Sequence, residues 1–161
     1  MDLTTAQLQT IKTDIANNGD LNAFPNTPDG NQSIADLYNL TFSPTFTVWK
    51  TMVKIGEIGN AFDSAELGGL TTANQSRLQT MAMYLAAGVN PSIAANRAFF
   101  DDVFSGAGGQ NTRASLAILW KRAARRIEKL FATGTGTSVS PATLVVEGKI
   151  TSTDVLNARN S

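Results

Sequence analysis

The stretch that most constrains the fold is residues 111–132, NTRASLAILWKRAARRIEKLFA, which has the periodicity of one long amphipathic helix. Apolar residues recur at helical spacing along one stripe, and cations fill the opposite side. Ile118 interrupts that polar side with one apolar residue. The pattern is that of a core stripe backed by a solvated face, or of a basic face that meets an acidic partner with Ile118 as an apolar contact. The cations of this face are Lys121, Arg122, Arg125, Arg126 and Lys129.

Formal charge is segregated along the chain, although the total is zero. Residues 1–110 carry five cationic and ten acidic side chains, whereas residues 111–132 carry six cationic and one acidic. The balanced total argues against a general nucleic-acid binder. The segregation indicates either that the acidic and basic parts fold together or that copies of the chain join head to side.

The chain contains neither cysteine nor histidine. That composition excludes disulfide scaffolds, thiolate zinc sites, cysteine nucleophiles and histidine-based triads. We find neither a signal-peptide pattern nor an apolar run of membrane-spanning length, so we expect a protein made and used in a cytoplasm, without a membrane partner.

Helix signals dominate the first 132 residues. Thr4 and Gln7 form a capping box before a helix predicted over residues 5–17. Further helices are predicted over residues 33–40 and 72–87, and from Ser43-Pro44 and Asn90-Pro91 onward. The segment TFTVWKTMV fits a strand and a helix equally well, and we expect a helix because a lone strand has no partner nearby. The fold class predicted is all-α, a small bundle of about five to six helices over residues 1–132, with residues 111–132 as one long helix.

Residues 133–161 differ in composition from the rest of the chain. They are rich in Gly, Thr and Ser, with a short β-prone segment at 144–146 and a final helical turn. Because this segment has little apolar surface, we predict an extended C-terminal arm that docks on its own body or on a neighbour. Its deletion is expected to leave the helical body folded. The docking candidates are Leu144, Val145, Val146, Ile150, Val155 and Leu156.

No arrangement of residues singles out a reaction. Gly106, Gly108 and Gly109 are followed by no Gly-Lys-Ser/Thr and are preceded by no predicted strand, so they indicate a hinge rather than a phosphate loop. Asp101 and Asp102 are adjacent on a predicted helix and diverge too far to share one cation. We therefore expect no catalytic residue, no metal site, no cofactor and no enzyme activity.

The run from Met83 to Asp154 resembles small proteins encoded among the virion-structure genes of tailed bacteriophages. The segments that carry the resemblance are YLAAGVNPSIAANRAFFDDVFSGAGG, TRASLAILWKRAARRIEKLFATGTG and SPATLVVEGKITSTDV, together with the earlier FSPTFTVWKT. These segments have no catalytic meaning, and the resemblance carries over no functional residue.

Within that setting, the chain is similar to head–tail connector (adaptor) proteins. The resemblance implies a subunit of a homo-oligomeric ring in the phage neck, in contact with the portal protein and with other neck or tail proteins. It also implies localisation in the virion and non-specific contact with packaged DNA. Two alternatives stay open. One is another virion part, such as a head-closure, tail-terminator or decoration protein. The other is a helical module that binds DNA through its basic helix.

Overall fold

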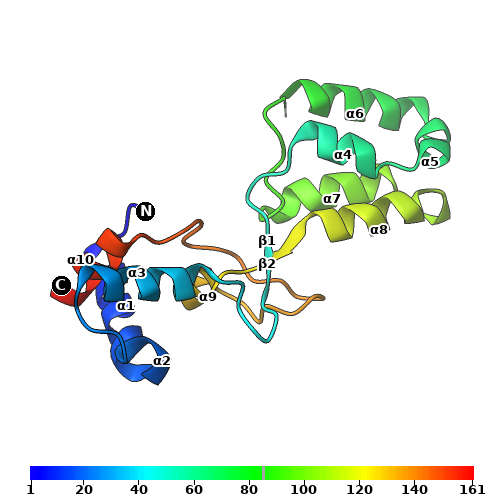
Figure 1. Cartoon of the computed structure of the whole chain (residues 1–161). Helices are drawn as coiled ribbons and strands as arrows, with labels where there is room; N and C mark the ends of the chain where they lie inside the picture. The colour runs from blue at the N-terminus through cyan, green and yellow to red at the C-terminus, as the bar shows by residue number, and fades with distance from the viewer. Residues whose placement is uncertain (85) are drawn as a thin grey trace. The chain divides into compact units, whose positions relative to one another are not determined.

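A computed structural model describes residues 1–84 and 86–161 and divides the chain into two compact units (Figure 1). Unit 1 comprises Met1–Phe46, Ala123–Thr133 and Val145–Ser161. Unit 2 comprises Thr47–Arg122 and Gly134–Leu144. Each unit is thus assembled from separate parts of the chain. This division differs from the predicted one, which placed residues 1–132 in one helical domain and residues 133–161 in an arm.

Unit 1 combines helices from both ends of the chain. Its helices are α1 (Thr5–Asn17), α2 (Gly19–Asn22), α3 (Pro28–Asn39), α9 (Arg126–Phe131) and α10 (Ser152–Asn160). The predicted helix over residues 5–17 is confirmed, including its capping box. Helix α3 begins earlier than predicted, because Pro28 occupies its first turn and the Thr27 hydroxyl accepts a bond from the Gly30 N–H.

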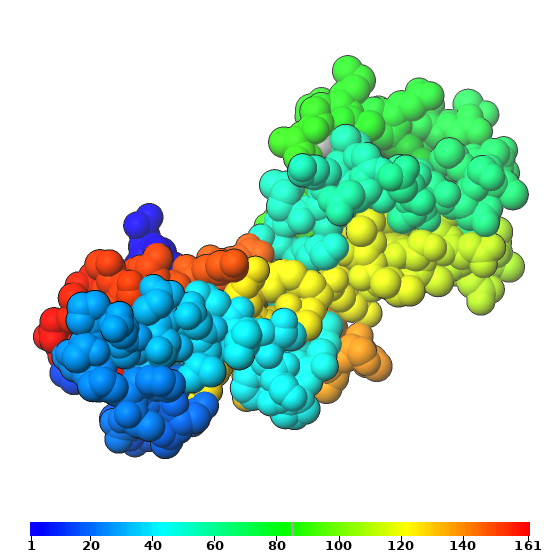
Figure 2. All heavy atoms as spheres, viewed as in Figure 1, coloured from blue at the N-terminus to red at the C-terminus, as the bar shows by residue number. Residues whose placement is uncertain are grey.

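The core of unit 1 joins these helices. Helix α10 packs against both α1 and α3, and Figure 2 shows the red C-terminal residues against the blue N-terminal ones. Burial of apolar side chains from distant parts of the sequence holds the unit together. The buried residues are Ile11, Ile15, Leu21, Ile34, Ala35, Tyr38, Ile127, Ile150, Val155 and Ala158.

Unit 2 is a separate helical cluster with its own core. Its elements are β1 (Thr47–Trp49), α4 (Ile55–Ala61), α5 (Ser64–Gly68), α6 (Thr72–Tyr84), α7 (Ala94–Val103), the short 3₁₀ helix η1 (Ala107–Gly109), α8 (Gln110–Leu119) and β2 (Lys121–Ala123), whose last residue belongs to unit 1. The chain packs closely at Gly109, where an added Cβ would lie 2.0 Å from the Phe104 carbonyl oxygen. The core residues are Val53, Ile58, Val89, Phe100, Val103, Phe104, Leu116 and Trp120.

The prediction of an all-α bundle with one long helix and an extended tail is wrong. The described residues form ten α-helices, and β1 pairs with β2 in a two-stranded antiparallel sheet. Residues 111–132 do not continue as one helix but divide into α8, β2 and α9. At the break Trp120 is buried, and its carbonyl oxygen accepts a 2.8 Å bond from the Lys50 N–H. Pairing with β1 thus supplies the backbone bonds that another helical turn would have made.

The helix predicted over TFTVWKTMV is also wrong, because residues 47–49 form strand β1. Its partners are remote in sequence. Strand β1 pairs with β2, and Val48 of β1 also forms a parallel bridge with Ala142. The Trp49 N–H donates to the Ala142 carbonyl at 3.0 Å, and the Ala142 N–H donates to the Thr47 carbonyl at 3.0 Å. Distant segments therefore supply the pairing that the local sequence lacks.

Candidate interaction surfaces

Two cations of the predicted basic face belong to unit 2. The Lys121 ammonium donates to the Ser138 carbonyl at 2.9 Å and lies 5.6 Å from the centre of the Trp49 ring. The Arg97 guanidinium lies 3.9 Å from the same ring, and burial lowers the pKa of Arg97. Arg122 is half-buried and is not free of partners in its own chain.

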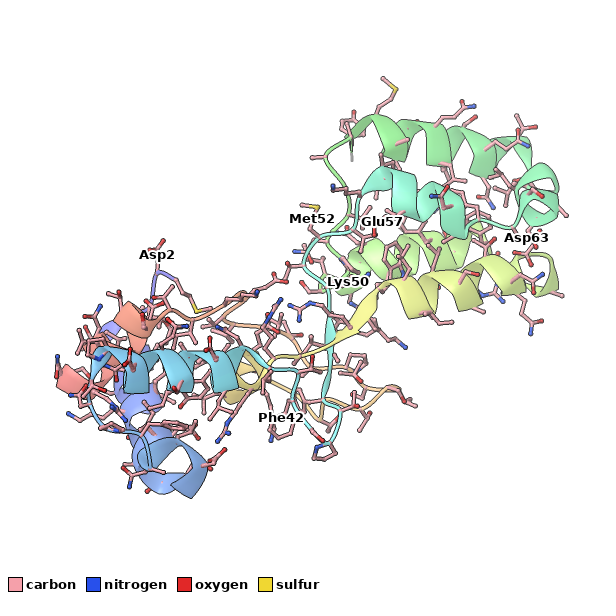
Figure 3. All side chains as sticks on the ribbon, in the orientation of Figure 1. Asp2, Phe42, Lys50, Met52, Glu57 and Asp63 are labelled. Carbon is pink, nitrogen blue, oxygen red and sulfur yellow. The ribbon has the colours of Figure 1, made fainter. Side chains whose placement is uncertain are left out.

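The other three cations belong to unit 1 and also contact their own chain. Arg126 forms an ion pair with Asp20, and the hydrogen bond between them raises the pKa of Arg126 and lowers that of Asp20. Arg125 pairs with Glu128 at 3.1 Å. The Lys129 ammonium lies 3.7 Å from the centre of the ring of Phe42, which Figure 3 labels. The predicted basic residues are therefore divided between two units and do not line one helix face.

Glu128 is a buried carboxylate that sequence reasoning did not single out. Its side chain is fully buried. It accepts bonds from the backbone N–H of Arg125 at 2.8 Å and that of Gly148 at 3.1 Å, besides its pair with the Arg125 guanidinium. These bonds cap α9 and fix the chain that leads to α10. The signal in the sequence was weak because the residue before the helix is Arg125 rather than the usual serine or threonine.

Five of the six predicted docking residues of the tail lie in unit 1, and three of them are buried there. Val146, Ile150 and Val155 are buried, whereas Val145 and Leu156 are exposed. The side chain of Asn39 fixes the segment through two hydrogen bonds. Its amide nitrogen donates to the Ile150 carbonyl at 2.8 Å, and its amide oxygen accepts from the Ile150 N–H at 2.9 Å. Leu144 is half-buried at the end of unit 2. The prediction that the tail is extended is wrong, because residues 145–161 complete a core that the N-terminal helices cannot close alone.

Helix α8 exposes the apolar side chain of Ile118, three and four residues before Lys121 and Arg122. Ile118 is 77% exposed and is the one large apolar side chain there. Its exposed neighbours on the helix are the small residues Ala114, Ser115 and Ala117. We name these four residues the Ile118 face. A branched apolar side chain that projects from small neighbours has the shape of a knob.

The start of α8 is fixed by the side chain of Glu66, which lies in α5 of the same unit. The Glu66 carboxylate accepts bonds from the backbone N–H groups of Asn111 and Thr112, both at 2.8 Å. Asp63, labelled in Figure 3, caps α5 with bonds from the N–H groups of Ala65 and Glu66. Desolvation acts to raise the pKa of Glu66, but the two backbone bonds outweigh it, and the pKa is lowered. This arrangement is structural: the donors at the helix start are already used.

An apolar pocket of about 250 Å³ opens between α4 and α6 in unit 2. None of its described lining residues is charged, and Gln79 supplies its polar side chain. Helix α6 covers the pocket loosely, since none of its described residues is buried. At the end of this helix Met83 and Tyr84 are each 82% exposed. The α4–α6 pocket is lined among others by Ile55, Ile58, Phe62, Leu78, Met81 and Ala82.

The described part of the chain offers neither a cluster of metal-ligating side chains nor a membrane-spanning helix. Residues 1–84 and 86–161 hold no group of three or more acidic, histidine or cysteine side chains able to bind a metal ion. Within the same residues, no helix has both the length and the hydropathy needed to cross a bilayer.

Comparison with known proteins gives no support for a family. No protein-family model matches the chain, and neither the curated proteins nor the solved structures contain a significant match.

Proposed function

We propose that this chain is a structural subunit of a tailed-phage neck, a head–tail connector (adaptor) that forms a ring between the portal and the tail. The observation that carries the proposal is exposed apolar surface on unit 2, at the α4–α6 pocket and, separately, at Met83, Tyr84 and Ile118. The resemblance of residues 83–154 to virion-structure proteins gives this surface its setting.

A contiguous exposed apolar patch is typical of a surface that binds another protein. Single apolar side chains on a surface need no explanation, but an open apolar pocket without a charged lining residue is more than a scattered residue. The cores of interfaces are poor in charge, as this surface is. A surface of this kind favours association with protein over binding of a charged ligand.

The tail gives this proposal no support, in contrast to the expectation from sequence. An arm that docks on a neighbour would have argued for a ring, but the apolar side chains of Ile150 and Val155 are buried in unit 1 of the same chain. Likewise, Arg126 and Lys129 contact Asp20 and Phe42, so the cations are poorly placed for a DNA backbone. Assembly through unit 2 is the stronger basis for a structural role.

Location in the particle tests the proposal. Antibodies against the chain, with gold labels, are applied to intact virions and to separated heads and tails. We expect label at the neck. Label spread over the head shell would instead assign a decoration protein, label at the end of the tail tube a terminator, and absence from the virion would contradict a structural role.

A second measurement concerns assembly. Phage that lack the gene for this chain are expected to accumulate filled heads and free tails that do not join, and a plasmid copy should restore joining. Infectious particles in normal yield without the protein would contradict the proposed function. The plasmid copy also serves as the background for the variants described below.

A further inference from the structure

We propose that Arg97 and Lys121 of unit 2, which converge on the ring of Trp49, bind phosphate groups of a nucleic-acid backbone without reading its bases. The three residues, named here the Trp49 cluster, come from α7, β2 and β1. The Arg97 guanidinium lies 3.9 Å and the Lys121 ammonium 5.6 Å from the ring centre, so the two charged groups are at most the sum of these distances apart, about 9.5 Å. The role of this contact in a phage neck rests on the proposed function, whereas the binding itself does not.

The charges of the Trp49 cluster are not neutralised within the chain. Among residues 1–84 and 86–161, the ion pairs include neither Arg97 nor Lys121. Instead, Arg97 donates to the Pro91 carbonyl, and Lys121 donates to the Ser138 carbonyl at 2.9 Å. Both side chains are half-buried, so part of each stays open to solvent. The chain thus holds two cations together and leaves their charge to an external anion.

Holding these two cations together is unfavourable unless an anion joins them. Like charges at this separation repel each other, and the repulsion increases where side chains are partly removed from water. Burial lowers the pKa of Arg97, although the nearby Asp101 carboxylate acts to raise it. Asp101 itself is exposed. A bound anion would offset both the repulsion and the loss of hydration.

The spacing of the two cations favours a nucleic-acid backbone over an acidic peptide. Along one strand of a duplex, phosphates recur about every 3.4 Å of helix axis, so both cations can reach a phosphate whatever the base sequence. An acidic peptide carries charge only where its sequence places Asp or Glu. It also brings backbone N–H groups, for which a guanidinium and an ammonium provide no acceptor.

The Trp49 cluster is pre-organised, unlike a pair of mobile surface cations. Contact with the ring and a bond to a backbone carbonyl hold each cationic side chain before a ligand arrives. The rotamer freedom that binding normally costs is therefore already lost on folding. A site of two cations is expected to bind weakly and to depend strongly on salt.

Salt titrations of duplex binding test the site. The probe is a short fluorescein-labelled duplex of random sequence, and fluorescence anisotropy reports its binding to the full-length chain. Neutralisation of two phosphates predicts a slope of about −1.8 for log affinity against log salt, which is roughly 60-fold weaker binding for a tenfold increase in salt. Arg97→Gln and Lys121→Gln should each halve that slope, which leaves roughly 8-fold weakening over the same range.

Matched variants separate this site from general effects of charge. Arg77→Gln removes the same charge from unit 2, but this guanidinium is already paired with Asp102 at 2.6 Å, so the slope should not change. Asp101→Asn removes the carboxylate that acts on Arg97 and should tighten binding at low salt. Circular dichroism checks the fold of each variant, and Lys121→Gln decides the test if the Arg97 variant is misfolded.

Several outcomes would overturn the proposal. They are an absence of duplex binding at low salt, a slope that neither Arg97→Gln nor Lys121→Gln reduces, and an equal reduction in Arg77→Gln. Polyglutamate that binds as tightly as the duplex would also overturn it, and would assign the Trp49 cluster to an acidic protein partner. Duplex binding that depends on the cluster, without label at the neck, would remove only the proposed function. Label at the neck, with duplex binding that neither variant weakens, would remove only this contact.

Discussion

Val145 and Val155 have the same side chain and lie in the same C-terminal segment, but their surroundings differ. Val155 is fully buried in the core of unit 1, and Val145 is 65% exposed. The sequence alone predicts the same docking role for both valines. Burial separates them, because only the side chain at 155 is removed from water when the segment packs.

This difference predicts unequal costs for the same substitution. Val155→Ala removes buried methyl groups and leaves a cavity, so the free energy of unfolding should fall by roughly 1–3 kcal/mol. Val145→Ala is the matched control, and its effect should stay within about 0.5 kcal/mol. Urea unfolding followed by circular dichroism measures both. Equal losses would mean that the tail does not pack as described.

Among the elements, helices with complete local signals were predictable from sequence. Helix α1 has its apolar spacing and its capping box within a few residues, and it forms with the predicted bounds. The break in residues 111–132 has no such signal, since neither Gly nor Pro interrupts the helical periodicity of this stretch. It depends on β1, which lies far away in sequence, and tertiary pairing overrides the helical pattern.

The candidate surfaces were predictable to different degrees for the same reason. Ile118 could be singled out as an apolar residue on a polar arc, and the structure places it on an exposed face of α8. The α4–α6 pocket could not be predicted, because it depends on the spacing between two helices. The buried Glu128 was missed because its backbone partner at Gly148 is supplied by a remote segment.

The stability of the fold at helix α8 should depend on pH through the ionisation of Glu66. Its pKa is lowered from the usual 4.5 in the folded chain, so the ionised form stabilises the fold above that value. This stabilisation is lost as pH falls through the lowered pKa. At pH 7, Glu66→Gln should lower the melting temperature by a few degrees, since it removes a charge from the start of the helix.

Melting curves between pH 7 and pH 2 test this element. The difference between the unmodified chain and Glu66→Gln should shrink as pH falls below 4.5 and vanish once the carboxyl is protonated in the folded state. Asp2→Asn, which removes an exposed carboxylate of unit 1, controls for loss of charge as such. A difference that is constant over the whole range would show that Glu66 acts without its charge.

At the scale of the whole molecule, each unit is built from segments that are separated in the sequence. Unit 1 takes its core from the N-terminal helices, from Ile127 in α9 and from residues 145–161. Arg159 ties the last helix to the loop before α3 through bonds to the Phe24 and Pro25 carbonyls at 2.7 and 2.8 Å. The C-terminal segment is therefore part of the fold of unit 1, while unit 2 contains none of it.

A truncation should consequently affect the two units differently. Removal of residues 145–161 deletes Ile150, Val155 and Ala158 from the core of unit 1. Buried aliphatic residues cost roughly 2–5 kcal/mol each when truncated, and a small domain has only about 5–15 kcal/mol of stability. Unit 1 should therefore unfold, whereas unit 2 keeps all of its residues. Hydrogen exchange should show lost protection in α1 and α3 and retained protection in α7 and α8.

Addition of the missing segment distinguishes loss of packing from general damage. A peptide of residues 145–161 supplies the same buried side chains in trans and should restore protection to α1 and α3 in the truncated chain. A Val155→Asp peptide should fail, because it would place an unpaired charge in the core of unit 1. Full protection of α1 and α3 without any peptide would contradict the burial of this segment, and would return it to the role of an arm free to reach a neighbour.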